Sequence, residues 1–193
     1  MMNLELKLWH LTLSLVVFLL ALLILTREQE SRRQRTVKWT VAGGVALYAF
    51  ACCLRFGETS KAVTGALFAL ILLYAAKSDI ETYIVGNFIS VEILILSFVA
   101  GDLATVPHRV ILAAVALLPG WIVSRIHPKQ VLGGADVKIT AASIFLIGSL
   151  WGFAGYALGL LLGAIWSVAR RKTQESFPLV PFLAVGFLTA FLI

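Results

Sequence analysis

The fold of this chain follows from one stretch, residues 62–79, which reads AVTGALFALILLYAAKSD. Residues 62–76 are almost entirely apolar, and the stretch ends at the carboxylic acid Asp79. A hydrocarbon core about 30 Å thick takes roughly 20 apolar residues per helix, so this run predicts a membrane-spanning helix. An ionisable group at the end of such a helix is costly and marks a candidate functional site.

The composition of the whole chain agrees with this interpretation. Hydrophobic residues make up 60% of the 193 positions, charged residues make up 13%, and the mean hydropathy is +0.95. So few polar side chains cannot coat a soluble globule of this length. We therefore expect an all-α polytopic membrane protein.

The same length criterion predicts about eight spans along the chain. The clearest are residues 8–26, 38–56, 62–77, 88–106, 109–124 and 178–193. The long apolar stretch from 132 to 170 is expected to divide near Gly148–Gly152 into a sixth and a seventh helix. The first span is too long for a signal peptide and no Ala-x-Ala-like site follows it, so we expect it to be retained. Residues 1–61 would then hold two helices with a basic loop, and residues 62–193 a six-helix core.

The basic residues predict the orientation, because cytoplasmic loops carry an excess of Lys and Arg. With the amino terminus outside, twelve basic residues lie on the inner side and four on the outer side. The inner residues are Arg27, Arg32, Arg33, Arg35, Lys38, Lys77, Arg125, Lys129, Lys138, Arg170, Arg171 and Lys172; the outer residues are Lys7, Arg55, Lys61 and Arg109.

A second acid, Asp136, lies in the stretch GGADVK, residues 133–138, which opens the sixth span. The predicted topology puts Asp79 and Asp136 on the same cytoplasmic side. Two carboxyl groups held close together in a low dielectric cannot both ionise readily, so one keeps a proton while the other acts as a base. Such a pair can activate water and protonate a leaving amine, as in aspartic proteases.

Other kinds of site have little support in the sequence. The net charge of +6 is explained by inner loops that face anionic lipid head groups, so we expect no nucleic-acid partner. The adjacent Cys52 and Cys53 are expected to be small buried hydrophobes, and the histidines His10, His108 and His127 are far apart. We expect neither a metal site nor a cofactor.

Three blocks in this chain resemble those of the type IV prepilin peptidases, which are membrane aspartic proteases of the Gly-x-Gly-Asp class. Residues 79–87, DIETYIVGN, are similar to the segment that carries the family's first aspartate and an Ile-Pro-Asn element. Residues 133–138, GGADVK, resemble the Gly-x-Gly-Asp-x-Lys element, and residues 177–186, FPLVPFLAVG, resemble Pro-Phe-x-Pro-Phe-Leu-x-x-Gly. The resemblance covers roughly residues 62–193.

The resemblance implies an intramembrane aspartic endopeptidase whose catalytic residues are Asp79 and Asp136. It implies that an active-site loop contains Gly133, Gly134, Ala135 and Lys138, and that Pro178 and Pro181 shape a wall of the site. The substrate would be a prepilin or pseudopilin, cut at the inner boundary of a bacterial or archaeal cytoplasmic membrane. The implied partners are this substrate and the lipid bilayer.

The chain departs from the family pattern at three places. Gly86 stands where proline is usual, and Ala135 stands where the second glycine of the element is usual. Alanine before Asp136 argues against a backbone conformation that only glycine adopts. The inner loop after the first span lacks the paired Cys-x-x-Cys segment of the bifunctional members, so we expect proteolysis without N-methylation.

Alternative interpretations stay open for the chain and for single residues. Buried acids also serve small ion-coupled transporters, and Gly-x-Gly-Asp proteases of the presenilin and signal-peptide-peptidase group cut other substrates. Asp79 and Asp136 could be helix-end residues that face water, Lys138 could extend toward the interface, and Glu92 could face a wet cavity. Structural roles are expected for Gly155, Gly159 and Gly163, whose spacing suits close helix packing.

Overall fold

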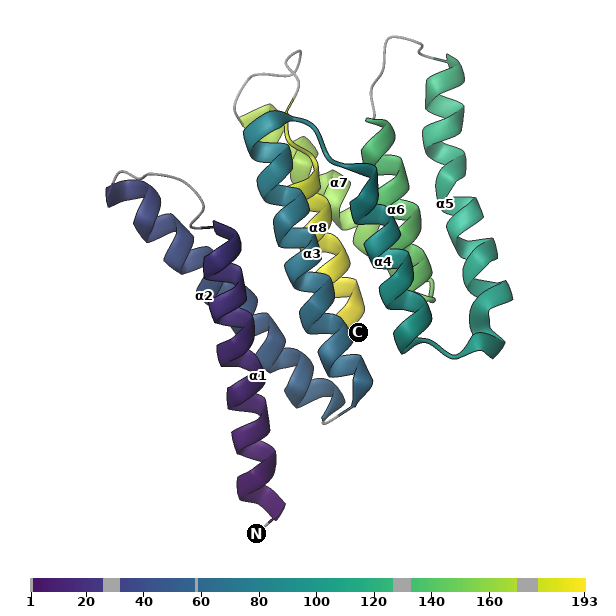
Figure 1. Ribbon diagram of the computed structural model, residues 1–193. Coiled ribbons are helices and arrows are strands. Elements are labelled where there is room, and N and C mark those ends of the chain that lie inside the picture. The colour runs from purple at the N-terminus through teal and green to yellow at the C-terminus, as the bar shows by residue number, and fades with distance from the viewer. Residues whose placement is uncertain (1, 26–31, 58, 127–132, 170–176) are drawn as a thin grey trace. The chain divides into compact units, whose positions relative to one another are not determined.

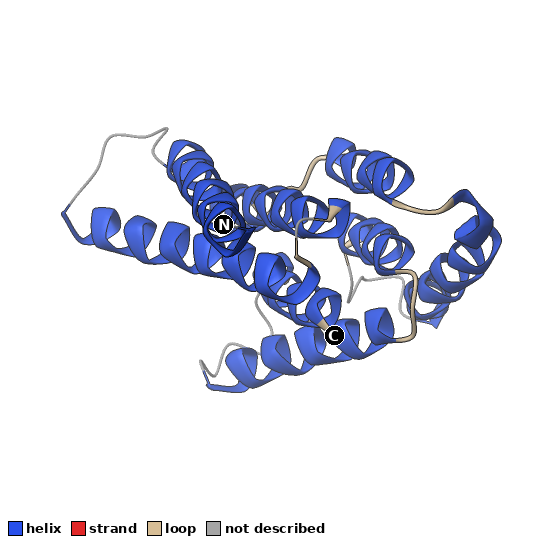
Figure 2. Ribbon diagram, turned by 90° about the horizontal axis from the view of Figure 1, so that it is seen from below, coloured by secondary structure: helices blue, strands red, loops and turns tan. Residues whose placement is uncertain are grey.

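The structure, a computed structural model, describes residues 2–25, 32–57, 59–126, 133–169 and 177–193. Within these ranges the chain forms eight α-helices and a short 3₁₀ helix, η1, and no strand (Figures 1 and 2). The expected all-α architecture is therefore confirmed. The elements are α1 (Met2–Leu25), α2 (Arg32–Phe56), α3 (Ser60–Thr82), α4 (Asn87–Ala100), η1 (Leu103–Thr105), α5 (Val106–Ile126), α6 (Gly134–Ile147), α7 (Trp151–Ala169) and α8 (Val180–Leu192).

In the described part of the chain, three helical segments are long and apolar enough to cross a membrane: Lys38–Phe56, Ser60–Thr82 and Trp151–Ala169. Four shorter apolar segments add to them, Trp9–Leu25, Asn87–Val99, Leu103–Pro119 and Val180–Leu192. The number of spans and their orientation stay predictions. Arg27, His127, Lys129, Arg170, Arg171 and Lys172, named above, lie outside the described residues.

The helix ends differ from the predicted spans at several places, and two of these differences have a clear cause. Helix α3 continues past residue 77 to Thr82, because no glycine or proline interrupts it and Lys77 pairs with Glu81 one turn later, at 3.6 Å. Helix α4 ends at Ala100 rather than near residue 106, since Gly101 adopts an extended conformation there. The predicted division between the sixth and seventh helices is confirmed, with Gly148 in the left-handed conformation (φ 65°) between α6 and α7.

The chain packs as two compact units whose boundary lies within α3. The first contains the chain up to Tyr74 together with Leu192, and the second contains Ala75–Phe191 together with Ile193. The predicted functional division after residue 61 is a separate matter that this packing does not test.

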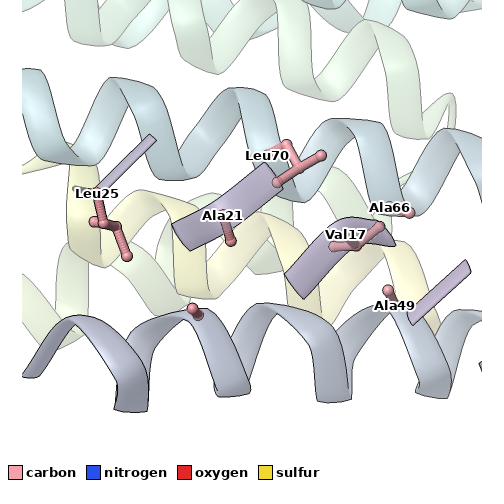
Figure 3. Packing of buried hydrophobic residues seen from close by; sticks show 7 residues of the cluster. Val17, Ala21, Leu25, Ala49, Ala66 and Leu70 are labelled. Carbon is pink, nitrogen blue, oxygen red and sulfur yellow. The ribbon is translucent and has the colours of Figure 1, made fainter. Parts of the chain in front are cut away.

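In the first unit, helices α1, α2 and α3 pack through small residues (Figure 3). The core cluster contains Val17, Ala21, Leu25, Ala42, Ala49, Ala66 and Leu70. Alanines at a helix contact allow the backbones to approach closely, which favours packing where the solvent is itself apolar. Cys52 and Cys53 are fully buried on α2, as expected of small hydrophobes.

In the second unit, α6 packs against α4, α5 and α7 (Figure 1). Helix α7 presents its buried glycines to α8: a Cβ built at Gly155 would lie 2.6 Å from the Gly186 carbonyl oxygen, and one at Gly159 would lie 2.8 Å from Leu183 Cα. The predicted packing role of these glycines is confirmed. This close contact fixes the start of α8, which belongs to the site described next.

Candidate active site

Asp79 lies in the last turn of α3 and is only 7% exposed. Its Oδ2 atom accepts a hydrogen bond of 2.9 Å from the backbone N–H of Val180, the first residue of α8. A buried carboxylate needs such donors, because an unpaired buried charge is strongly unfavourable. The bond joins the first and third blocks of the sequence, which are 101 residues apart.

The start of α8 leaves this amide free for Asp79. Leu179 is the N-cap residue but has no capping side-chain bond, and Pro181 has no N–H to donate. The N–H groups of Phe182 and Leu183 both donate to the Leu179 carbonyl oxygen. The carboxylate of Asp79 therefore caps α8 from another helix, at the end where the helix dipole favours negative charge.

Asp136 lies in the first turn of α6, three residues after the N-cap residue Gly133. Its carboxyl group folds back to the backbone N–H of Gly133, which is the reciprocal half of a capping box. A Cβ built at Gly133 would lie 2.9 Å from Asp136 Oδ2, whereas one at Gly134 would meet nothing within 4 Å. Only the first of these glycines is thus required by the position of the carboxyl group.

The two carboxyl groups interact electrostatically. Burial raises the pKa of Asp136 to about 6, and the neighbouring Asp79 adds to that rise, while the hydrogen bond from Gly133 opposes it. Asp136 lies at the helix end, outside the three segments with the length and hydropathy of a span. Asp79 and Asp136, which we expect on the same side of the membrane, are therefore near enough to interact within the second unit.

The loop between α3 and α4 is held by side chains near Asp79. Ser78 Oγ donates to the Ile84 carbonyl oxygen at 2.7 Å, and Thr82 Oγ1 accepts from the Ile84 N–H at 3.2 Å. Tyr83, between Thr82 and Ile84, has a φ of 54°. This left-handed conformation costs a residue with a β-carbon about 1–2 kcal/mol. The loop therefore has a defined, locally strained conformation.

Lys138 connects this loop to the second aspartate segment. Its Nζ atom donates a hydrogen bond of 2.9 Å to Asn87 Oδ1, at the first residue of α4. Both side chains are exposed, so this bond contributes little to stability by itself. It does link the two segments that carry Asp79 and Asp136.

Two of the three departures from the family pattern, Gly86 and Ala135, have simple structural explanations. Gly86 has φ −66° and ψ 140° as the N-cap residue of α4, a conformation that proline also adopts. Ala135 lies inside α6, and Tyr83 is the described non-glycine residue with positive φ. Neither position requires glycine for its backbone conformation.

The sequence did not indicate three groups near the acids. The Val180 N–H is a backbone group, so no side-chain pattern identifies it. Asn87 was part of the first block but had no assigned role. Tyr156, on α7, lies within electrostatic range of Asp136. The sequence pattern around it, with Gly155 and Gly159, indicates helix packing only.

The remaining acids discussed above lie elsewhere. Glu81 pairs with Lys77, and Glu92 is exposed on α4. In the described part of the chain, no three His, Cys, Asp or Glu residues are grouped so that they could hold a metal ion. The chemistry that this geometry offers is proton transfer between two coupled carboxyl groups.

Comparison with known proteins gives a consistent result. The sequence profile of the type IV leader peptidase family matches residues 66–168, more than half of the chain and both aspartates. A prepilin leader peptidase/N-methyltransferase from Bacillus subtilis (strain 168) is 26% identical in an alignment of 150 residues that covers 72% of this chain. The chain spans 59% of the length of that relative. No solved structure matched the chain.

Together with the apolar helices, these matches identify a multi-pass membrane protein. The third block, residues 177–186, lies beyond the matched region but supplies the amide that binds Asp79. The chain belongs to the type IV leader peptidase family.

Proposed function

We propose that this protein is an aspartic endopeptidase that removes the leader peptide of a prepilin-like or pseudopilin substrate. The observation that carries the proposal is the pairing of Asp79 with Asp136, each bound by a backbone N–H from the start of a helix. Membership of the leader peptidase family supports this reaction over ion-coupled transport.

The environments of the two acids suggest different roles. Asp79 accepts the Val180 N–H at the start of α8, and that hydrogen bond favours its charged form. The pKa of Asp136, raised to about 6, keeps more of this carboxyl group protonated in mildly acidic conditions than is usual for an aspartate. Asp79 then acts as the base and Asp136 as the acid, although the protons titrate as a property of the pair.

The proposed reaction is hydrolysis of one peptide bond. Asp79 takes a proton from water as the water oxygen bonds to the carbonyl carbon, and Asp136 gives its proton to the carbonyl oxygen. The carbon–nitrogen bond then breaks as the leaving nitrogen receives a proton from Asp79, and the hydroxyl proton of the intermediate returns to Asp136. The pair regains its initial protonation state.

The substrate class follows from the family and from the predicted topology. The Bacillus subtilis relative is a prepilin leader peptidase/N-methyltransferase. The excess of basic residues predicts that both acids lie at the inner membrane boundary, where a short leader would meet an apolar substrate helix. We extend the proposal to cleavage without methylation, because the two cysteines are adjacent and buried on α2 rather than arranged as paired metal-binding motifs.

The test is co-expression with a candidate prepilin and measurement of leader loss by gel shift. Asp79→Asn and Asp136→Asn each remove an acid while keeping side-chain size, and both are expected to abolish cleavage. The matched control is Asp102→Asn, because Asp102 caps η1 through the Ala104 N–H and asparagine caps equally well. Full processing by either active-site variant refutes the proposal.

Mass spectrometry of the mature amino terminus tests the extension separately. An unmethylated amino terminus is expected, and an added methyl group contradicts that part of the proposal alone.

A further inference from the structure

Two buried hydroxyl groups of α6 have no hydrogen-bond partner among the described residues. They belong to Thr140, which is 1% exposed, and to Ser143, which is 0% exposed. A buried hydroxyl left without a partner costs about 1–3 kcal/mol. Such groups normally bind an internal water or a neighbouring polar group.

Both hydroxyls follow Asp136 on the same face of α6. Thr140 and Ser143 come four and seven positions after Asp136, and helical residues at these spacings lie on the same side of the helix. Asp136 lies at the end of this face, in the first turn. A polar stripe therefore runs from the Asp136 carboxyl group into an otherwise apolar interior.

Helix α7 packs beside this stripe, and its register places Tyr156 opposite Thr140. A Cβ built at Gly152 would lie 3.1 Å from Ile144 Cγ1 and 3.3 Å from Ile144 Cα, so Gly152 of α7 faces Ile144 of α6. The tight turn at Gly148 makes the two helices run in opposite directions. One turn further along α7 is Tyr156, and one turn back along α6 is Thr140.

An electrostatic observation agrees with this register. The charge of Asp136 acts on the phenol group of Tyr156, so the two side chains are within electrostatic range of each other. No direct hydrogen bond between them is formed in the described structure. Polar groups that interact without a direct hydrogen bond are commonly bridged by a water molecule.

We propose that Tyr156 is a positioning residue whose hydroxyl, together with that of Thr140, holds an internal water against the inner side of the Asp136 carboxyl group. The water would have three partners, the two hydroxyls and the carboxyl group, which is the usual number for a buried water. It satisfies the Thr140 hydroxyl and fixes the rotamer of Asp136. The expected effect of this water on cleavage rests on the proposed function. The existence of the water site does not depend on it.

The other charged groups near Asp136 are accounted for. Asp79 faces it from α3, and Lys138 of α6 donates to Asn87 on α4. Glu92 is exposed on α4, and Arg125 of α5 lies over the Trp121 ring. Helix α8 has no ionisable side chain. Asp79 titrates together with Asp136, so the effect of removing the Tyr156 hydroxyl is measured as a shift of the pair.

The test compares Tyr156→Phe with the unchanged full-length protein in detergent. The first readout is carbodiimide labelling of protonated Asp136 against pH, followed by peptide mass spectrometry, which needs no catalysis. Loss of the water donor disfavours the carboxylate, so the labelling midpoint is expected to move upward by about one pH unit. The second readout is leader cleavage, where we expect kcat to fall about tenfold and KM to change less than about twofold.

The controls separate positioning from packing. Thr140→Val removes the second hydroxyl at constant shape and is expected to shift the midpoint in the same direction, whereas Thr140→Ser restores it. Tyr48→Phe removes a phenol hydroxyl from α2 in the first unit and is expected to shift nothing. An unshifted labelling midpoint in folded Tyr156→Phe overturns the inference. A shifted midpoint in a protein that cuts no prepilin supports the water site and refutes the proposed function instead.

Discussion

The substitution Gly133→Ala tests whether the position of the Asp136 carboxyl group controls the reaction. The backbone of Gly133 has φ −66° and ψ 140°, which alanine adopts without strain, so the fold should persist. The new Cβ would however lie 2.9 Å from Asp136 Oδ2 and 3.6 Å from its Cγ. The carboxyl oxygen has to retreat by about half an ångström to reach ordinary contact distance.

The retreat has two costs. It weakens the hydrogen bond from the Gly133 N–H, and bonds to charged groups contribute about 1.5–3 kcal/mol, equivalent to tenfold or more in rate. It also displaces a reacting group, and a misplacement of about 1 Å costs about 100-fold. We therefore expect kcat for leader cleavage to fall between about 10-fold and 100-fold.

The matched variant is Gly134→Ala, one residue later, where the added Cβ meets nothing within 4 Å. It is expected to change kcat by less than about twofold and to stabilise α6 by up to about 1 kcal/mol, since alanine favours helix more than glycine does. Cleavage is measured in membranes against a time course, with thermal unfolding in detergent as the check on folding. Equal cleavage rates for the two variants would refute the reasoning.

Three further predictions address pH, the loop and helix packing. Because burial and the neighbouring carboxylate raise the pKa of Asp136 to about 6, and the proposed acid must be protonated, cleavage is expected to decline as pH rises through about 6 in a pH–rate profile of purified protein. Gly86→Pro is expected to raise stability by about 0.4–1 kcal/mol in thermal unfolding, because the φ of −66° already fits proline; a loss of stability would mean that the exposed ring two residues later cannot rotate away. Gly155→Ala places a Cβ 2.6 Å from the Gly186 carbonyl oxygen and is expected to cost about 1–3 kcal/mol, whereas Gly44→Ala, with open space around it, should cost nothing measurable in the same assay.

The sequence was sufficient to predict the site residues that can be recognised from their local sequence alone. An acid at the end of an apolar run is unusual wherever it occurs, so Asp79 and Asp136 could be identified before their separation in space was known. The break between α6 and α7 was also predictable, because Gly148 can adopt a positive φ at no steric cost.

The sequence was insufficient to predict features of the site that depend on tertiary contacts. The end of α3 was placed too early, because apolar character ends at residue 76 while the helix continues through Asp79 and a Lys77–Glu81 pair. The capping of α8 by Asp79 uses the N–H of the first helical residue, which has no partner within its own helix, and a carboxylate 101 residues earlier in the chain. The sequence did not indicate a role for Tyr156, because its position opposite Thr140 depends on the register between α6 and α7.

A backbone N–H at the start of a helix binds each of the two acids, but the two helix starts depend differently on the rest of the fold. Asp136 is bound by the N-cap residue of its own helix, so its backbone contact lies within residues 133–136. Asp79 is bound by the start of α8, so its position depends on the contact between α7 and α8. Widening that contact with Gly155→Ala should therefore displace Asp79 and change carbodiimide labelling of Asp136 only through the electrostatic interaction of the two acids, whereas Gly133→Ala should alter the labelling of Asp136 directly and more strongly. If both variants altered the labelling of Asp136 equally, the two acids would have to be positioned by one shared element rather than by two independent helix starts.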